Sequence, residues 1–183
     1  MNYKVIALIG KSGAGKDRIL QELVKQKSNN IHEIISCTTR PIREGEVDGK
    51  NYHFLSNEVF AEQILQNDFL EATVFNEWAY GTRKQDLDIN KINIGVFNPE
   101  GIYYLLEHKD IDLKVYYIIA TDKTRLIRQL NREKNPNVEE IIRRYSTDKI
   151  DFMNLEFSYE SLMNETPSDF FDAVDRILED NIY

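Results

Sequence analysis

Cysteine and long apolar runs are scarce in this sequence, and their scarcity excludes several kinds of protein. With one cysteine, Cys37, among 183 residues, no disulfide can form within the chain, so a reducing compartment is expected and the cytoplasm is the default location. The opening apolar run at residues 5–9 is far too short for a membrane span, and it lacks the longer apolar region of a signal peptide. We therefore expect neither a membrane protein nor a secreted one.

Positive charge is also in short supply. The 23 lysines and arginines face 31 aspartates and glutamates, which gives a net charge of -8 at pH 7. Non-specific electrostatic binding to nucleic acid or to an anionic membrane is therefore not expected, and any anion site must be formed by a local group of residues. The three histidines show no metal-ligand spacing. The length suits one compact domain, which could act as a monomer or a homodimer.

The sequence does contain an alternation of apolar strands and amphipathic helices. Apolar β-forming residues predict the main buried strands at residues 3–9, 34–35, 92–97, 113–119 and 159–163. Apolar residues at helical spacing predict helices after the first strand, from residue 98, from about residue 122, from residue 137 and at the end of the chain. This alternation predicts an α/β fold of three layers, α/β/α, with a mainly parallel central sheet.

Two stretches interrupt the alternation. Residues 36–50 predict a long functional loop, which is followed by a strand at 52–55, a helix from Ser56 and short strands near 69–75 and 78–81. The polar break at residues 134–137 predicts a lid tip, after which Asn137 and Glu140 form a capping pair for a second long helix. The final helix is predicted to place five apolar side chains on one face: Phe170, Phe171, Val174, Ile177 and Leu178.

A phosphate-binding motif follows the first strand. Residues 10–16 read GKSGAGK and match GxxxxGK between a buried strand and a helix. In such a loop the backbone N–H groups and the helix N-terminus cradle phosphate oxygens, while Lys16 neutralises their charge. The motif therefore predicts a nucleotide phosphate site made by Gly10, Lys11, Ser12, Gly13, Ala14, Gly15 and Lys16.

The residue after the motif is unusual. Asp17 stands where a serine or threonine hydroxyl normally binds the magnesium ion. A carboxylate is a good ligand for a hard cation, so Asp17 could hold Mg²⁺ directly or through water. It could equally be a favourable negative charge at the N-terminus of a helix.

Two further blocks carry a family resemblance. Residues 36–54 read SCTTRPIREGEVDGKNYHF, and residues 69–82 read FLEATVFNEWAYGT. Together with the phosphate-binding loop, they resemble guanylate kinase, strongly through residue 82 and in outline over the whole chain. The resemblance implies Mg²⁺-dependent transfer of the γ-phosphate of ATP to GMP or dGMP. It also implies a core of residues 1–35, 84–125 and 146–183, a GMP-binding insert of residues 36–83 and a lid of residues 126–145.

The resemblance assigns the acceptor phosphate to the insert. Arg40, Arg43 and Tyr52 would hold the phosphate of GMP, with Tyr80 helping. Two guanidinium forks suit a dianionic phosphate. Glu46 matches an acidic position that the family has near the metal and phosphates, but it could also be an ordinary turn carboxylate.

The same resemblance assigns recognition of the base to three residues. Glu71 would accept hydrogen bonds from the guanine N1–H and exocyclic amine, and Ser36 and Thr82 would donate to O6. Adenine has no N1–H and carries an amine where guanine has O6, so it would leave these groups mismatched. The pattern therefore predicts a preference for guanine.

The match is weaker in the second half of the chain. Residues 94–101 read IGVFNPEG, so Asn98 stands where the family has an aspartate. Asn98 could hydrogen-bond a water or an arginine, but it is better explained as the cap of the helix that Pro99 begins. Asn164 resembles a late asparagine of the family near adenine.

Phosphoryl transfer also needs cations that reach over the transferring phosphate. The candidates in the lid are Arg128, Arg132, Arg143 and Arg144, of which we rank Arg132 and Arg144 first. Two other functions stay open: a guanylate-kinase-like binding module without phosphate transfer, as in scaffold proteins, and a kinase for another nucleoside monophosphate. The sequence does not choose between GMP and dGMP.

Overall fold

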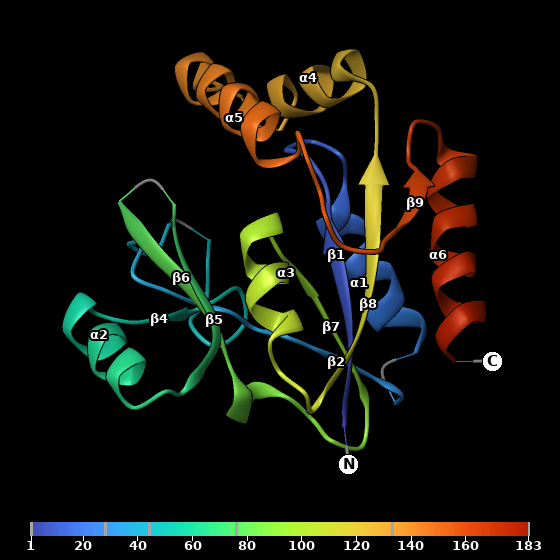
Figure 1. Ribbon diagram of the computed structural model, residues 1–183. Helices are drawn as coiled ribbons and strands as arrows, with labels where there is room; N and C mark the ends of the chain where they lie inside the picture. The colour runs from blue at the N-terminus through green and yellow to red at the C-terminus, as the bar shows by residue number, and fades with distance from the viewer. Residues whose placement is uncertain (1, 28, 44, 76, 133, 183) are drawn as a thin grey trace.

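The computed structural model describes residues 2–27, 29–43, 45–75, 77–132 and 134–182. Ser28 of the polar cluster expected to end the first helix, and Glu44 and Asn76 of the two family blocks, lie outside these ranges. The described chain forms a five-stranded sheet and a separate four-stranded sheet. Figure 1 shows the smaller sheet beside the larger one, with two helices at the top of the view that extend from above the larger sheet toward the side of the smaller one.

The larger sheet is parallel throughout. It is made of β1 (Tyr3–Ile9), β2 (Ile31–Glu33), β7 (Ile92–Val96), β8 (Ile111–Ile119) and β9 (Glu160–Met163). The strand order is β2-β7-β1-β8-β9, so β1 lies at the centre between β7 and β8. The loop that follows β1 therefore lies at the carboxyl edge of the sheet, where ligands bind in open α/β sheets.

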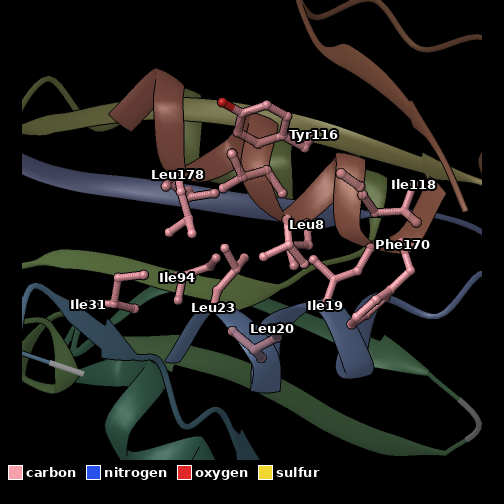
Figure 2. Packing of buried hydrophobic residues seen from close by; sticks show 14 of the residues in the cluster. Leu8, Ile19, Leu20, Leu23, Ile31, Ile94, Tyr116, Ile118, Phe170 and Leu178 are labelled. Atoms are coloured by element: carbon pink, nitrogen blue, oxygen red, sulfur yellow. The ribbon is translucent and has the colours of Figure 1, made fainter. Parts of the chain in front are cut away.

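Both faces of the larger sheet are covered, which explains the near-continuous apolar sequence of β1. Ile6 and Leu8 pack into one apolar cluster, with side chains of α1 (Lys16–Gln26) and α6 (Pro167–Asn181). Figure 2 shows Leu8 among Ile19, Leu23 and Phe170 in this layer. Val5 and Ala7 point to the opposite cluster, which contains α3 (Pro99–Leu106). The three-layer α/β/α arrangement is thus confirmed.

The smaller sheet is mixed. It consists of β3 (Cys37–Thr38), β4 (His53–Phe54), β5 (Phe69–Phe75) and β6 (Trp78–Arg83), in the order β4-β3-β6-β5. β3 and β4 are parallel, whereas β3 pairs antiparallel with β6, and β5 pairs antiparallel with β6. The helix α2 (Asn57–Leu65) precedes β5, and the short 3-10 helix η1 (Lys84–Asp86) follows β6.

The remaining helices are α4 (Asp122–Leu130) and α5 (Val138–Asp151). In Figure 1 they lie at the end of β8, on the side of the core where the loop after β1 is found. Half of the predicted capping pair of α5 is confirmed, because Asn137 Oδ1 accepts a hydrogen bond from the Glu140 N–H at 3.0 Å, whereas the Glu140 carboxylate accepts from Arg143 and Arg144. Within the described residues, no helix is both long enough and apolar enough to cross a membrane.

Three predictions of local structure were wrong in detail. The second strand is Ile31–Glu33 and not residues 34–35, because the parallel pairing with β7 uses the residues before Ile34. The loop predicted at 36–50 contains the short strand β3, which pairs with two distant strands. Phe171 is 54% exposed, since the stripe of α6 that faces the sheet passes through Phe170 and Val174.

Candidate active site

The loop between β1 and α1 has the shape that its glycines require. Gly10, Gly13 and Gly15 all have positive φ angles. A Cβ atom on Gly10 would lie 2.5 Å from the Ile118 carbonyl oxygen of the neighbouring strand β8, so the loop can leave the sheet here only with glycine. The loop thus turns directly from the central strand into the N-terminus of α1.

Lys16 lies inside this loop. Its Nζ donates a hydrogen bond to the Gly10 carbonyl at 2.5 Å. Burial lowers the pKa of Lys16, while the nearby Asp17 and Asp148 carboxylates oppose the shift. The ammonium group is therefore held where loop-bound phosphates would lie, close to two carboxylates.

Asn164 holds the backbone of the loop by a hydrogen bond. It follows β9, its side chain is almost fully buried, and its Nδ2 donates to the Ala14 carbonyl at 2.7 Å. Arg128 reaches the same place from α4, donating from Nη1 to the Ala14 carbonyl at 3.2 Å and from Nη2 to the Asn164 carbonyl at 2.8 Å. Both side chains therefore hold the loop in place, and Arg128 binds it rather than extending into the cleft.

A cleft of about 540 Å³ runs from the loop to the smaller sheet. It brings together most of the residues that the sequence singled out: Gly10, Ser12, Lys16, Asp17, Ser36, Arg40, Arg43, Tyr52, Glu71, Tyr80, Arg132 and Arg144. Glu46 and Asn98, whose roles were left open, also line it. Side chains from the core, the smaller sheet and the α4–α5 region thus share one cavity.

Arg40 is the most enclosed cation of the cleft. It is 5% exposed, and its two terminal nitrogens donate to the Glu46 carboxylate at 3.0 and 2.8 Å. The guanidinium also lies over the rings of Tyr52 and Phe54, at 5.5 and 5.6 Å from their centroids. Glu46 further accepts from the Arg43 N–H at 2.8 Å, and the hydrogen bond from Arg40 is the main cause of its lowered pKa. Glu46 therefore orients Arg40.

Tyr52 and Tyr80 extend this corner. Their ring centroids are 6.0 Å apart in an edge-to-face arrangement, and both rings line the cleft. Burial raises the pKa of the Tyr52 hydroxyl, so it stays protonated and can donate a hydrogen bond at neutral pH. Arg40, Arg43 and the two tyrosines thus form a set of donors on one wall of the cleft.

A second corner is built around Glu71. Glu71 on β5 pairs directly with Thr82 on β6. Glu71 is 7% exposed, and burial raises its pKa to about 7, a shift that neighbouring Thr82 opposes only in part. Thr82 is fully buried behind Glu71 and is not among the residues that line the cleft. Its hydroxyl lies near enough to the Glu71 carboxylate to hold the pKa of that group down, although the two make no hydrogen bond of regular geometry.

Asn98 joins this corner to α3. Its Oδ1 caps the helix by accepting from the Gly101 N–H at 2.8 Å, as predicted, and its Nδ2 donates to the Thr73 hydroxyl at 3.3 Å. A Cβ atom on Gly101 would lie 3.2 Å from Glu71 Oε2, so the start of α3 packs closely against the Glu71 carboxylate. The asparagine therefore caps the helix and also fixes it to β5.

Arg132 and Arg144 face the cleft from the α4–α5 side. Arg132 is exposed, and Arg144 Nε donates to Glu140 at 2.8 Å. Glu140 also accepts a hydrogen bond from Arg143 at 2.7 Å. The hydrogen bond from Arg143, followed by that from Arg144, lowers the pKa of Glu140 to about 2. The structure places both favoured arginines at the rim, and their roles stay predictions.

The sequence analysis missed Asp148 and Arg125. Asp148 lines the cleft and accepts hydrogen bonds from both the N–H and the hydroxyl of Ser12. Arg125 binds Asp148 and donates from Nε to the Ser12 carbonyl at 2.9 Å. One signal was available, since Asp148 lies four residues after Arg144 and shares its helical face.

Magnesium would have to be held partly by substrate. Within the described part of the chain, no group of three or more histidine, cysteine, aspartate or glutamate side chains could hold a metal ion. Asp17 nevertheless lines the cleft next to Lys16. One carboxylate completed by phosphate oxygens and water is a usual environment for Mg²⁺, so the residues present fit this ion.

Comparison with known proteins agrees with this geometry. The family model described as "Guanylate kinase" matches residues 2–181. A guanylate kinase of Onion yellows phytoplasma (strain OY-M) is 31% identical over 178 residues, covering 95% of this chain and 82% of the relative. One from Clostridium perfringens (strain 13 / Type A) is 32% identical over 181 residues, covering 95% and 82%. The crystal structure of guanylate kinase from Anaplasma phagocytophilum has a TM-score of 0.65 at 20% identity, covers 98% of this chain and 85% of that one, and supports the fold.

Proposed function

The chain belongs to the guanylate kinase family, and on this basis we propose that its cleft transfers the γ-phosphate of ATP to GMP or dGMP. The observation that carries the proposal is that one cleft contains both Lys16 of the phosphate-binding loop and Glu71 of the smaller sheet. A phosphate site alone fits many nucleotide-binding proteins. In this family, the buried carboxylate of Glu71 beside the Thr82 hydroxyl would read the base, and a base reader together with a phosphate site would specify the acceptor.

Guanine fits the corner around Glu71 by its pattern of donors and acceptors. The carboxylate of Glu71 would accept from N1–H and the exocyclic amine, and the hydroxyls of Ser36 and Thr82 would donate to O6. The Thr82 hydroxyl, which makes no hydrogen bond of regular geometry within the described residues, would gain a well-placed acceptor. Adenine has an acceptor at N1 and an amine where guanine has O6, so its groups would not match Glu71 and the two hydroxyls. Each buried group left without a partner would cost about 1–3 kcal/mol of binding free energy.

The acceptor phosphate fits the wall formed by Arg40, Arg43, Tyr52 and Tyr80. Arg40 is already held in place by Glu46 and by the ring of Tyr52, so little of its side-chain freedom remains to be lost on binding. A phosphate carries up to two negative charges, which the two guanidinium groups would neutralise. The substrate would thus be fixed at both its base and its phosphate.

The donor fits the other end of the cleft. The ATP phosphates would bind the loop amides and Lys16, while Asn164 and Arg128 keep the loop in place. Bound Mg²⁺, with Asp17 as its protein ligand, would neutralise charge on the phosphate oxygens. Arg132 and Arg144 would reach the transferring group from the rim.

The reaction needs no general base from the protein. An oxygen of the GMP phosphate, already anionic near neutral pH, forms the new bond to the γ-phosphorus of ATP. The bond between that phosphorus and the β–γ bridging oxygen breaks, so GDP and ADP are the products. The chain therefore aligns the two nucleotides, neutralises the charge of the transferring group and excludes water.

The test is a coupled assay of ADP release, run with every common ribo- and deoxynucleoside monophosphate as acceptor. We expect turnover with GMP and dGMP, and rates at least a hundredfold lower with AMP, CMP and UMP. Binding of GMP without ADP release would identify an inactive binding module, and turnover with another monophosphate would contradict the reading of Glu71. Omitting the acceptor measures the ATP lost to water.

The surroundings of the reaction are part of the proposal. We place the enzyme in the cytoplasm, where nucleotides are phosphorylated and where a buried free thiol such as that of Cys37 stays reduced. The net charge of -8 supports small nucleotides, rather than nucleic acid or membrane, as its partners. A monomer and a homodimer both agree with a cleft whose lining comes from one chain.

A further inference from the structure

The phosphate-binding loop already holds an anion that comes from the chain itself. The Ser12 N–H donates to Asp148 Oδ2 at 2.9 Å, and the Ser12 hydroxyl lies 3.3 Å from Asp148 Oδ1. Asp148 belongs to α5, 136 residues away in sequence. Loops of this type use their backbone N–H groups to bind phosphate oxygens. A carboxylate oxygen is likewise a negatively charged hydrogen-bond acceptor, so Asp148 takes a place that suits a phosphate.

Arg125 holds this carboxylate against the loop. Arg125 is 2% exposed, and its Nη2 binds Asp148 Oδ2. Its Nε donates to the Ser12 carbonyl at 2.9 Å, and its Nη1 donates to Asp122 at 2.7 Å. The guanidinium also lies 4.5 Å from the ring centroid of Tyr145. Ser12 is therefore bound at its N–H by Asp148, in the last turn of α5, and at its carbonyl by Arg125, in the first turn of α4.

The loop backbone is closely packed against α4. A Cβ atom on Gly13 would lie 2.7 Å from the Arg125 carbonyl oxygen, so α4 packs directly onto the loop backbone. A terminal phosphate that bound the Ser12 N–H would meet the Asp148 carboxylate at the same donor. Two anions cannot share one N–H donor at hydrogen-bond distance without strong repulsion, so one of them must leave.

We infer that Asp148 is a positioning residue which competes with the terminal phosphate of the donor nucleotide for the Ser12 N–H. In the nucleotide-free chain Asp148 ties α5 to the loop. When the donor binds, its phosphate displaces Asp148, and α5, which also carries Arg144, is released from the loop. Arg125 remains beside the loop with one fewer carboxylate partner. The inference rests on the proposed function only in taking the loop as the site of the donor phosphates.

The substitution Asp148→Asn tests this competition, because asparagine keeps the size and one acceptor oxygen but removes the charge. Calorimetry should show that ATP and inorganic pyrophosphate bind about three- to thirtyfold more tightly to the variant, since the competing charged hydrogen bond is weakened. Adenosine, which has no phosphate, should bind within twofold of wild type. Affinities for ATP and pyrophosphate that are unchanged within twofold, or weaker, would overturn the inference.

Two matched variants separate charge from packing. Asp148→Glu keeps the charge and should not tighten ATP binding, whereas Asp148→Ala removes it and should tighten ATP binding as Asp148→Asn does. Glu139→Gln removes one charge from an exposed position in the first turn of the same helix and should leave the ATP affinity unchanged. Tightening of ATP binding by Glu139→Gln to the same degree would show a general charge effect and overturn the role of Asp148.

A measurement on the wild-type chain needs no substitution. During an NMR titration with pyrophosphate, the amide signal of Ser12 and the carboxyl-carbon signal of Asp148 should move together and saturate at the same concentration. A shift of Ser12 alone would overturn the inference. A wild-type chain that shows the joint shift but never phosphorylates GMP would contradict the proposed function and leave the competition intact. If the wild-type chain phosphorylates GMP but the Asp148→Asn variant binds ATP with unchanged affinity, the competition would be contradicted and the proposed function would stand.

Discussion

The two ends of the cleft differ in how far the chain satisfies its own polar groups. At the loop, Lys16 binds the Gly10 carbonyl, the Ser12 N–H binds Asp148 and the Ala14 carbonyl accepts from Asn164. At the corner around Glu71, burial raises the pKa of the carboxyl, and the nearby Thr82 hydroxyl makes no hydrogen bond of regular geometry within the described residues. A ligand at the loop would therefore have to replace internal partners, whereas a ligand at the corner around Glu71 would meet groups that are only weakly satisfied.

This difference has a consequence for affinity and specificity. A site that must release internal partners binds its ligand with a reduced net gain, because each new hydrogen bond replaces an existing one. A site with unmet buried groups gains fully from the correct ligand and penalises the wrong one. We therefore expect discrimination between nucleotides to come from the Glu71 corner, and the release of α5 to come from the loop.

The largest effect is expected from the loop end. Replacing Lys16 with methionine should lower kcat about 100- to 1000-fold, since the proposed function uses this half-buried ammonium group to neutralise the phosphates of ATP. The measurement is the steady-state rate with GMP. Lys25→Met is the matched control, because Lys25 lies on the same helix, is exposed and pairs only weakly with Glu22 at 3.8 Å. Rates within threefold of wild type for Lys16→Met would contradict the role given to the loop.

At the base corner, Glu71→Gln should lower kcat/KM for GMP about 30- to 1000-fold, through a loss of about 2–4 kcal/mol. The amide of glutamine would oppose its own donors to the guanine N1–H or amine, which leaves buried groups unmet. The already slow rate with AMP should hardly change, so the ratio of the two rates measures discrimination. A variant that lost GMP and AMP turnover equally would show that Glu71 supports the fold and does not read the base.

On the phosphate wall, Arg40→Ala should lower kcat/KM for GMP about ten- to a hundredfold, from the loss of a charge-assisted contact of about 1.5–3 kcal/mol. Arg83→Ala is the control, because Arg83 makes a comparable paired contact with Asp86 at 2.7 Å but does not line the cleft. A change below threefold for Arg40→Ala would refute the phosphate role. It would leave the pair with Glu46 as purely structural.

The raised pKa of Glu71 predicts a pH dependence of the base corner. Guanine binds the ionised carboxylate, so its affinity should rise as the pH passes upward through about 7, the pKa of Glu71 in the free chain. From pH 6 to pH 8 the ionised fraction rises about tenfold, and the affinity should rise by the same factor. Guanosine is the proper ligand for this calorimetric test, because the phosphate of GMP titrates near pH 6 itself. A flat profile would contradict the raised pKa.

The features that could be predicted from the sequence are those made by residues close together along the chain. The strand, loop and helix around residues 3–26 are contiguous, so buried apolar residues, glycines and helical spacing predicted them together. The caps at Asn98 and Asn137 were predicted for the same reason, since each bonds an N–H only three residues away. The residues of the base corner came from the family resemblance, and the structure brings Glu71 and Thr82 into direct register.

What the sequence could not show is set by contacts distant along the chain. Asp148 binds Ser12 across 136 residues, and Arg128 reaches Ala14 across 114. Neither contact follows from local spacing, because each depends on how α4 and α5 pack on the loop. The position of β2 was misjudged for a related reason: pairing with β7, rather than the apolar pair Ile34 and Ile35, decides where that strand lies.

The smallest effect is expected at Asp17, where the loop end meets the metal. If Asp17 is a ligand of Mg²⁺, Asp17→Ser should keep turnover within about tenfold, because a serine hydroxyl is the ligand usual at this position. The free Mg²⁺ concentration that gives half the maximal rate should nevertheless shift about threefold or more, since a neutral ligand attracts the cation less. Calorimetric titration of Mg²⁺ into the ADP complex checks this independently of the rate. Glu22→Gln, on the same helix but outside the cleft lining, should leave both values unchanged. An identical magnesium titration in Asp17→Ser would reduce Asp17 to a favourable charge at the N-terminus of α1, and the difference between the two ends of the cleft would then rest on the internal partners of the loop and not on a metal ligand.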